Sequence, residues 1–181
     1  MQELSLNILD VANNSVKAGA KFVNISLNYD DKNYLKLTVS DDGSGMTKEV
    51  LSKLKDPFYT SRTTRKVGLG IPFLTLLAEQ TGGYVEIESE VGIGTKIIAS
   101  FDTNSIDMLP IGNLGSTAST LISGSPDVDF VFHVSRGELE FTLDSAEIKI
   151  LLDGVPVSTP QVALFIEEYA NDNFLQIIES K

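Results

Sequence analysis

The spacing of apolar and polar residues divides the first hundred positions into helix-like and strand-like segments. Helices are predicted in residues 4–18, 47–55 and 71–80. Strands are predicted where every second residue is apolar, in residues 21–29, 33–40, 84–90 and 95–101. The strands form two pairs, each joined by a short turn, so the pattern predicts two hairpins interleaved with helices.

The rest of the chain has a different pattern. Residues 103–122 are predicted to be a connector, because glycine, proline and serine interrupt them. Residues 129–135 and 138–143 alternate and predict a third hairpin. Asp144 with Glu147 predicts a short helix that ends at Asp153, and Pro160 begins a longer helix towards Ile178. We therefore divide the chain into a domain of residues 1–102 and an acidic C-terminal extension, residues 103–181, with a hairpin and two helices. The extension either folds alone or packs on the first domain.

Composition indicates a globular protein. Of the 181 residues, 42% are hydrophobic, yet no apolar run reaches the roughly 18 residues of a membrane span. No leader pattern precedes the first helix, so we expect the protein in the cytoplasm. The chain has no cysteine and one histidine, which excludes disulfides, thiolate metal sites and a histidine metal cluster.

The charge distribution favours a small anionic ligand. The net charge of −11 argues against general nucleic-acid binding, which needs a basic surface. Residues 1–102 hold 11 basic and 13 acidic side chains, whereas residues 103–181 hold 3 and 12. Six of the 14 basic residues fall between Lys48 and Lys66. Locally concentrated positive charge in an acidic protein suits a phosphorylated small molecule.

The first predicted helix carries a polar stripe beside its apolar one. Leu4, Ile8, Val11, Ala12 and then Ser15 or Val16 form the apolar stripe, and Gly19 ends the helix. Asp10, Asn14 and Lys17 are spaced by four and three residues, so they share one side. Asn14 can offer its carbonyl oxygen to Mg²⁺, and Asp10 can hold or deprotonate a water molecule. The alternative is an ordinary solvated helix face.

A carboxylate ends the second predicted strand. Leu35, Leu37 and Val39 face the core, and strand alternation sends Asp41 to the same side. A carboxylate that faces an apolar interior needs a fixed donor, which the exocyclic amine of a purine can provide. The alternative is a simple Asp-Gly turn.

Residues around Asp41 extend this hypothesis. Asp42, of opposite alternation, is expected to face solvent. Gly43 and Gly45 leave room for a flat ring beside the strand end. Thr95, at the start of the last strand, can support Asp41 through a water molecule.

A glycine pair opens the helix predicted in residues 71–80. Gly68 and Gly70 allow a tight turn, and the helix N-terminus then presents free N–H groups to an anion. Arg62, Arg65 and Lys66 precede the pair and can add charge-assisted contacts to phosphates. The alternative is an ordinary tight connection.

Together these segments resemble the GHKL superfamily of ATP-binding domains, which includes sensor histidine kinases, type II topoisomerase subunits, MutL proteins and heat-shock chaperones. Four ordered motifs carry the resemblance over residues 1–102, and GIGT (92–95) completes it. ILDVANNSVKAGA (8–20) resembles the N box, DDGSGM (41–46) the first glycine box, DPFYTSR (56–62) the F box and VGLGIPF (67–73) the second glycine box. The combination is most similar to the histidine-kinase branch.

The resemblance implies a fold and a ligand set. The fold is α+β, a two-layer sandwich in which helices cover one face of a mixed, mainly antiparallel sheet. The cofactors are ATP and Mg²⁺, with Asn14 as metal ligand and Asp41 bonding the adenine amine. The implied nucleotide-binding residues are Asn14, Asp41, Gly43, Gly45, Met46, Arg62, Arg65, Lys66, Gly68, Leu69, Gly70 and Thr95.

Two departures from the family bear on the activity. Asp10 stands where hydrolysing members have a longer Glu, which disfavours in-line attack by water. The N box begins almost at Met1, so we expect no preceding dimerisation domain with a phosphoacceptor histidine. His133 is expected to be an ordinary strand residue. Three hypotheses stay open: a stand-alone kinase acting on a partner protein, a non-catalytic ATP sensor, and a slow ATPase.

Overall fold

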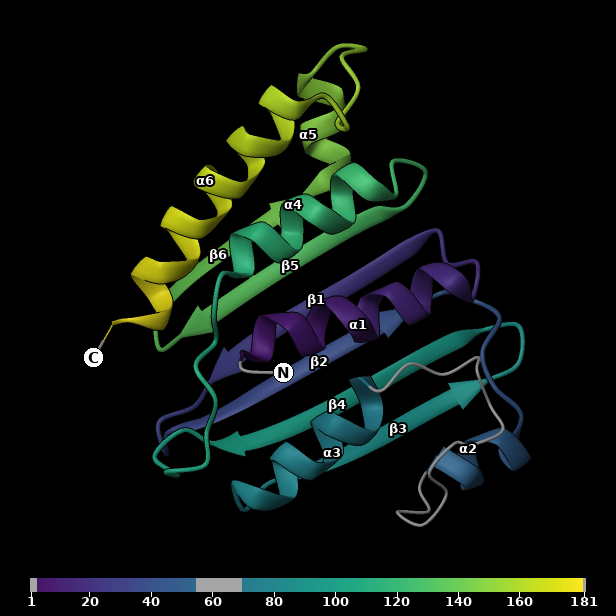
Figure 1. Cartoon of the computed structure of the whole chain (residues 1–181), viewed down its shortest axis with the longest axis vertical. Coiled ribbons are helices and arrows are strands. Elements are labelled where there is room, and N and C mark those ends of the chain that lie inside the picture. Colours follow the sequence, from purple (N-terminus) through teal and green to yellow (C-terminus); the bar gives the residue numbers. More distant parts are fainter. Residues whose placement is uncertain (1–2, 55–69, 181) are drawn as a thin grey trace.

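The computed structural model describes residues 3–54 and 70–180. The fold is a six-stranded sheet with helices packed on one side of it (Figure 1). The strand order is β3-β4-β2-β1-β5-β6, and every pair is antiparallel except β1 with β5. The helices are α1 (Leu4–Lys17), α2 (Lys48–Leu54), α3 (Gly70–Gln80), α4 (Leu114–Gly124), α5 (Ser145–Leu151) and α6 (Pro160–Ile178). The strands are β1 (Phe22–Tyr29), β2 (Tyr34–Asp41), β3 (Tyr84–Glu90), β4 (Gly94–Asp102), β5 (Asp129–Arg136) and β6 (Leu139–Asp144).

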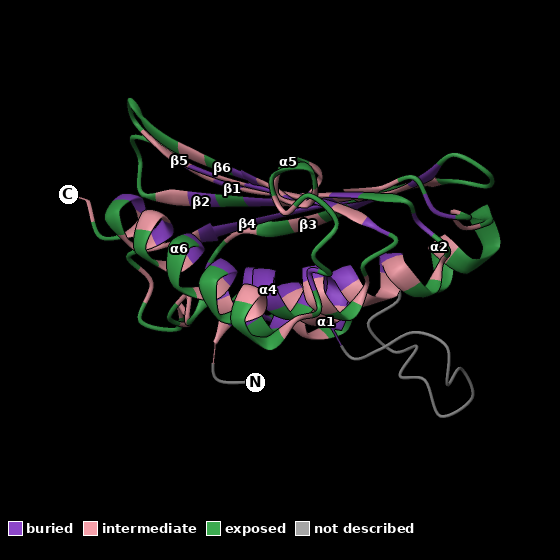
Figure 2. Cartoon of the chain, turned by 90° about the horizontal axis from the view of Figure 1, so that it is seen from above, coloured by how far each residue is buried: buried purple, intermediate pink, exposed green. Residues whose placement is uncertain are grey.

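The core lies between the sheet and the helices. Figure 2 shows α1, α4 and α6 on one side of the sheet, with their buried residues turned towards it. The apolar stripe predicted for α1 is buried, since Leu4, Ile8 and Ala12 are fully covered. The predicted α+β sandwich with a mixed, mainly antiparallel sheet and helices on one face is therefore confirmed. None of the described helices is both long and apolar enough to cross a membrane.

The C-terminal segment packs on the N-terminal one by continuing its sheet. Strand β5 lies parallel to β1, with Ile25 opposite Phe132, and β6 follows as the outermost strand. Helix α4 packs against both α1 and α6. Strand pairing and helix packing thus give the two segments one shared core, which answers the question that the sequence left open.

Helix α4 corrects one prediction. Residues 103–122 were predicted to be a connector, but a helix begins at Leu114, and the Asn113 side chain caps it by accepting a hydrogen bond from Ser116 N. A Cβ at Gly115 would lie 2.4 Å from the Glu167 carbonyl oxygen of α6. Small residues are therefore needed where α4 and α6 approach closely. A segment rich in small residues has the composition of a loop, which is why the sequence predicted a connector here. Residues 103–180 contain three helices rather than the predicted two.

Tyr29 and Arg136 link β1 to β5, and this contact predicts a dependence of stability on alkaline pH. Burial raises the pKa of Tyr29 to about 12, although the Arg136 guanidinium 3.9 Å from the ring centre opposes the shift. An unfolded tyrosine has a pKa near 10, so between about pH 10 and 12 only the unfolded chain loses the proton. The contribution of Tyr29 to stability is complete below pH 10 and is lost as the pH rises through that range.

Tyr29→Phe should remove this loss. Between pH 9 and 11.5 the free energy of unfolding of the variant should fall by about 2 kcal/mol less than that of the parent. Urea titrations at both pH values measure the difference, with Tyr84→Phe, at a half-exposed tyrosine, as the matched control. Equal losses in the Tyr29 variant and the parent would contradict the assignment.

Candidate functional site

Asp41 ends β2 and holds three elements together. Its Oδ2 accepts a hydrogen bond from Ser15 Oγ of α1 at 2.6 Å. Its Oδ1 accepts from Gly43 N at 2.9 Å and from Thr95 N of β4 at 3.3 Å. A carboxylate has about four acceptor positions, so one stays free for a ligand donor. The carboxylate is fixed by the protein and keeps room for one further hydrogen bond.

Ser15 was missed as a site residue. The sequence offered it only as one possible member of the apolar stripe of α1, yet its hydroxyl is buried and donates to Asp41. The signal that identifies it is a small polar residue within an otherwise apolar helix stripe, next to Asn14. Ser15 orients the carboxylate from the helix side.

Asp42 is exposed, as predicted from strand alternation, and it also has a structural role. Its Oδ1 accepts hydrogen bonds from Phe22 N at 2.9 Å and from Lys21 N at 2.7 Å. The hydrogen bond from Phe22 N, with a smaller contribution from that of Lys21 N, holds the pKa of Asp42 below its ordinary value, although burial opposes the shift. Asp42 fixes the start of β1 rather than only facing solvent.

The loop after Asp41 lies directly on the β3–β4 turn. A Cβ at Gly45, where φ is +64°, would lie 1.9 Å from the Glu90 carbonyl oxygen. A Cβ at Gly94 would lie 1.9 Å from the Asp41 carbonyl oxygen. Gly45 and Gly94 are thus required by backbone packing. For Gly45 this reason is independent of the room for a flat ring that the sequence predicts.

Ser89 of β3 holds the same loop in place through hydrogen bonds. Its Oγ accepts a hydrogen bond from Met46 N at 2.8 Å and donates to Gly94 O at 3.0 Å. It also lies 2.9 Å from Thr95 Oγ1. Thr95 therefore reaches Asp41 directly through its backbone N–H, while its hydroxyl faces Ser89. Ser89 could not be identified from the sequence, because serine in an edge strand is unremarkable by pattern.

The other end of the site lies where α3 begins beside α1. A Cβ at Gly70 would lie 2.9 Å from Asp10 Cβ, so glycine allows the N-terminus of α3 to contact α1 at Asp10. Asn14 lies one helical turn further along α1, and Ser15 follows it. Asp10 beside Gly70, and Ser15 bonded to Asp41, thus define a row along α1 from the start of α3 to the end of β2. Figure 1 shows these three elements next to one another.

The side chain of Asn14 has no hydrogen bond among the described residues, and its Nδ2 is buried. Asn7, seven residues earlier on the same side of α1, is fully buried with both polar atoms unpaired. A carboxamide with free bonding capacity suits Mg²⁺, which keeps most of its ligands as water and phosphate oxygen. No cluster of three or more acidic or histidine ligands occurs in residues 3–54 and 70–180.

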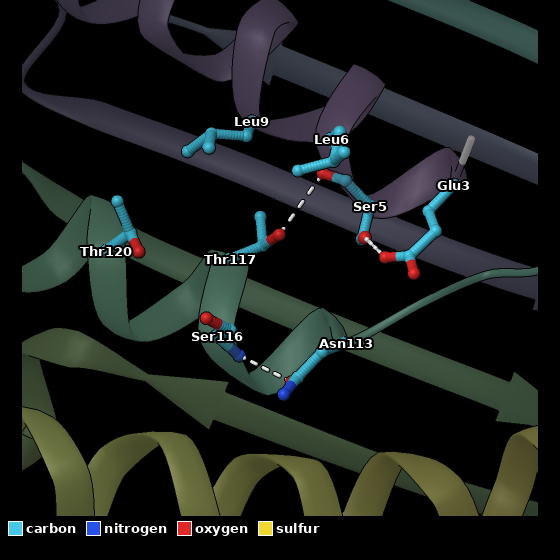
Figure 3. Close-up of a pocket in the computed structure, with 8 residues that line it drawn as sticks. All are labelled: Glu3, Ser5, Leu6, Leu9, Asn113, Ser116, Thr117 and Thr120. Carbon is cyan, nitrogen blue, oxygen red and sulfur yellow. Dashed lines mark hydrogen bonds between the residues drawn. The ribbon is translucent and has the colours of Figure 1, made fainter. Parts of the chain in front are cut away.

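Part of the predicted site lies outside the described residues, namely Arg62, Arg65, Lys66, Gly68 and Leu69. The described part contains a hollow of about 340 Å³ beside Asp41, bordered by Thr95, Glu88 and Lys96. A smaller hollow of about 130 Å³ lies between α1 and α4 (Figure 3), where Thr117 Oγ1 donates to Ser5 O at 3.1 Å. No predicted site residue lines this second hollow.

His133 lies in β5, on the sheet face away from the main helices, and its Nδ1 is 2.9 Å from Thr142 Oγ1 of β6. It belongs to a cross-strand pair with Thr142. This position agrees with the expectation of an ordinary strand residue.

Comparison with known proteins places this arrangement in a family. Residues 1–105 match the family described as "Histidine kinase-, DNA gyrase B-, and HSP90-like ATPase". The match covers more than half of the chain, so the protein belongs to this family. The resemblance to GHKL domains drawn from the motifs is confirmed.

The similar curated proteins are sensor kinases. The chain is 38% identical over 66 residues to Sensor kinase CckA of Brucella abortus, covering 36% of this chain and 7% of that protein. It is 30% identical over 95 residues to Sporulation kinase E of Bacillus subtilis, covering 52% and 13%. The chain therefore spans less than a fifth of the length of these relatives. It carries an ATP-binding, kinase-like domain related to those of sensor histidine kinases.

A solved structure supports the fold. The N-terminal domain of a DNA repair protein superimposes with a TM-score of 0.56 at 13% identity, covering 80% of this chain and 53% of that chain. The coverage of 80% reaches beyond residues 1–105, so the likeness in fold includes part of the C-terminal segment.

Proposed function

We propose that this protein binds Mg²⁺ and ATP along the row from Asp41 to α3 and transfers the γ-phosphoryl group to a partner protein in the cytoplasm. Asp41 carries the proposal, because the protein fixes its carboxylate with three donors and leaves one acceptor position free. The adenine amine takes that position. The loop with Gly43, Gly45 and Met46 borders the base, and Thr95 holds Asp41 from β4.

The phosphates lie towards the start of α3. Gly70 allows the helix N-terminus to come close to Asp10, and free N–H groups at a helix start bind phosphate oxygens. We assign further phosphate contacts to Gly68, Leu69, Arg62, Arg65 and Lys66 as predictions from the motifs. Asn14 is the proposed metal ligand, supported by its unpaired carboxamide between the two ends of the row. A bound Mg²⁺ neutralises charge on the phosphates.

Transfer rather than hydrolysis follows from the side chain at position 10. In phosphoryl transfer, the acceptor oxygen or nitrogen bonds to Pγ as the bond from Pγ to the bridging oxygen breaks, and ADP leaves with the electron pair. The protein contributes positioning, and Asp10 is the proposed residue that orients the acceptor. Its carboxylate is one methylene shorter than the Glu of hydrolysing members, which disfavours activation of water. A non-catalytic ATP sensor and a slow ATPase are the competing functions, since all three use the same site.

Following the label of [γ-³²P]ATP separates these functions. The full chain is incubated with Mg²⁺, labelled ATP and a cell extract, alongside extract alone and the Asp10→Asn variant. Label on a second protein, lost in the variant, supports the kinase. Free phosphate in a purified sample supports the ATPase, and unchanged ATP with measurable binding supports the sensor.

Asn14→Ala should abolish the dependence of nucleotide binding on Mg²⁺. Alanine cannot supply the carbonyl oxygen, so affinities measured with Mg²⁺ and with EDTA should become equal. Calorimetric titration with ATP measures both. Asn13→Ala is the matched control, because Asn13 is the adjacent residue of the same type on α1 and should keep the difference. A difference that persists in the Asn14 variant would refute the metal role.

A further inference from the structure

The outer edge of β6 is a free strand edge. Strand β6 is the last of the sheet, and none of the described strands pairs with its outer side. Alternate residues of Leu139–Asp144 bond to β5, and the others therefore present backbone N–H and C=O groups that can bond to an added strand. An exposed edge of this kind is normally protected or used.

A chain of aromatic contacts leads from the core to this edge. Phe132 and Phe174 are fully buried, with ring centres 6.3 Å apart. Phe174 contacts Phe141 of β6 at 5.5 Å, and Phe141 contacts Tyr169 of α6 at 5.7 Å. Tyr169 then stacks on Phe165 at 5.8 Å with an interplanar angle of 8°. The aromatic core thus continues onto the surface beside β6.

The last two aromatic side chains of this series are exposed. Phe165 is 60% exposed and Tyr169 45%. Leu139 is 51% exposed and shares the helix-side face of β6 with Phe141, because alternate residues of a strand share a face. We call Leu139, Phe141, Phe165 and Tyr169 the β6-edge surface. An added strand would cover these side chains with those that it turns towards α6.

Acidic residues surround the β6-edge surface. Glu138 and Glu140 are exposed at the start of β6. Glu168 and Asp172 are exposed on α6, on the same side of the helix as Phe165. The described basic residues of the C-terminal segment are both engaged elsewhere: Arg136 lies over Tyr29 and bonds to Ser180 O, and Lys149 pairs with Asp129 at 2.7 Å.

We propose that the β6-edge surface binds an extended segment of a second protein in which apolar and basic residues alternate. The apolar side chains cover Phe165 and Tyr169, the basic ones face Glu140 and its acidic neighbours, and the backbone pairs with β6. A second copy of this chain is a poor occupant, since pairing two β6 edges brings their carboxylates together. Protection against aggregation explains the acidic residues but leaves the exposed Phe165–Tyr169 pair without a role.

A designed peptide tests the proposal on the full chain without nucleotide. The probe is a labelled octapeptide of alternating valine and lysine, compared with the same peptide carrying a central proline. Fluorescence anisotropy should show saturable binding of the first peptide only, because proline interrupts strand pairing. Amide exchange followed by NMR should slow in β6 and stay unchanged in β3, the other edge strand.

Matched variants locate the contact. Phe165→Ser should weaken peptide binding roughly tenfold or more, whereas Leu164→Ser, at a 55% exposed leucine of the same helix, should not. Glu140→Lys, at an exposed position, should weaken binding, whereas Glu86→Lys, also exposed, on the β3 edge should not. Equal losses in the two lysine variants would show nonspecific charge attraction and overturn the proposal. The proposal would also be overturned by peptide binding without protection of β6, by absence of peptide binding, or by dimers formed through this surface in sedimentation experiments.

Discussion

Asp41→Asn is expected to weaken ATP binding by about 1 to 3 kcal/mol, which is roughly 5- to 150-fold in the dissociation constant. The substitution replaces one carboxylate oxygen by an amide that donates rather than accepts. The carboxylate accepts hydrogen bonds from Ser15 Oγ, Gly43 N and Thr95 N. The amide nitrogen of asparagine would therefore face either one of these donors or the adenine amine, and in both cases a hydrogen bond is lost. Calorimetric titration with ATP and Mg²⁺ measures the loss.

Two controls make this result specific to the ligand contact. Asp42→Asn alters the neighbouring exposed carboxylate, which bonds to Phe22 N and Lys21 N, and should leave the affinity for ATP unchanged. Ser15→Ala removes one donor to Asp41 but keeps the charge, so it should weaken binding less than Asp41→Asn. Equal effects of the variants at positions 41 and 42 would contradict the adenine assignment.

Gly45→Ala is expected to lower the free energy of unfolding by about 3 to 5 kcal/mol. The residue has φ of +64°, and its Cβ would lie 1.9 Å from the Glu90 carbonyl oxygen, a backbone atom that cannot move without displacing the β3–β4 turn. Because the loop also positions Met46 N on Ser89, nucleotide binding should be lost together with stability. Urea titration measures the first effect, and thermal shift with ATP the second.

Gly92→Ala separates backbone strain from close packing. Gly92 lies in the β3–β4 turn with φ of +79°, but nothing lies within 4 Å of the position that its Cβ would take. Alanine there has only the conformational cost, about 1 to 2 kcal/mol. If the two glycine variants lose equal stability, the close approach of the loop to the β3–β4 turn is not what Gly45 provides.

Local patterns were sufficient to predict most elements. Alternation located the three hairpins because each pairs neighbouring strands whose core-facing residues repeat every second position. The capping residues of α5 marked its start, where Asp144 accepts from Ala146 N. The ordered motifs gave the family and with it the sandwich, which spacing alone does not specify.

Long-range features were not predictable in this way. The parallel pairing of β1 with β5 joins residues more than 100 positions apart, and no local pattern encodes it. Helix α4 was missed because close packing on α6 selects small residues that resemble a loop. Ser15 and Ser89 were missed because their roles arise from partners brought together only by the fold. The roles of Asp10, Asn14 and the residues outside the described ranges stay predictions.

The most direct test of this account is a calorimetric titration of the purified full chain with ATP, in the presence of millimolar Mg²⁺. We expect a saturable heat of binding with one site per chain, and a lower affinity when EDTA replaces the metal. Absence of any heat, together with a melting temperature that millimolar ATP and Mg²⁺ leave unchanged, would contradict it.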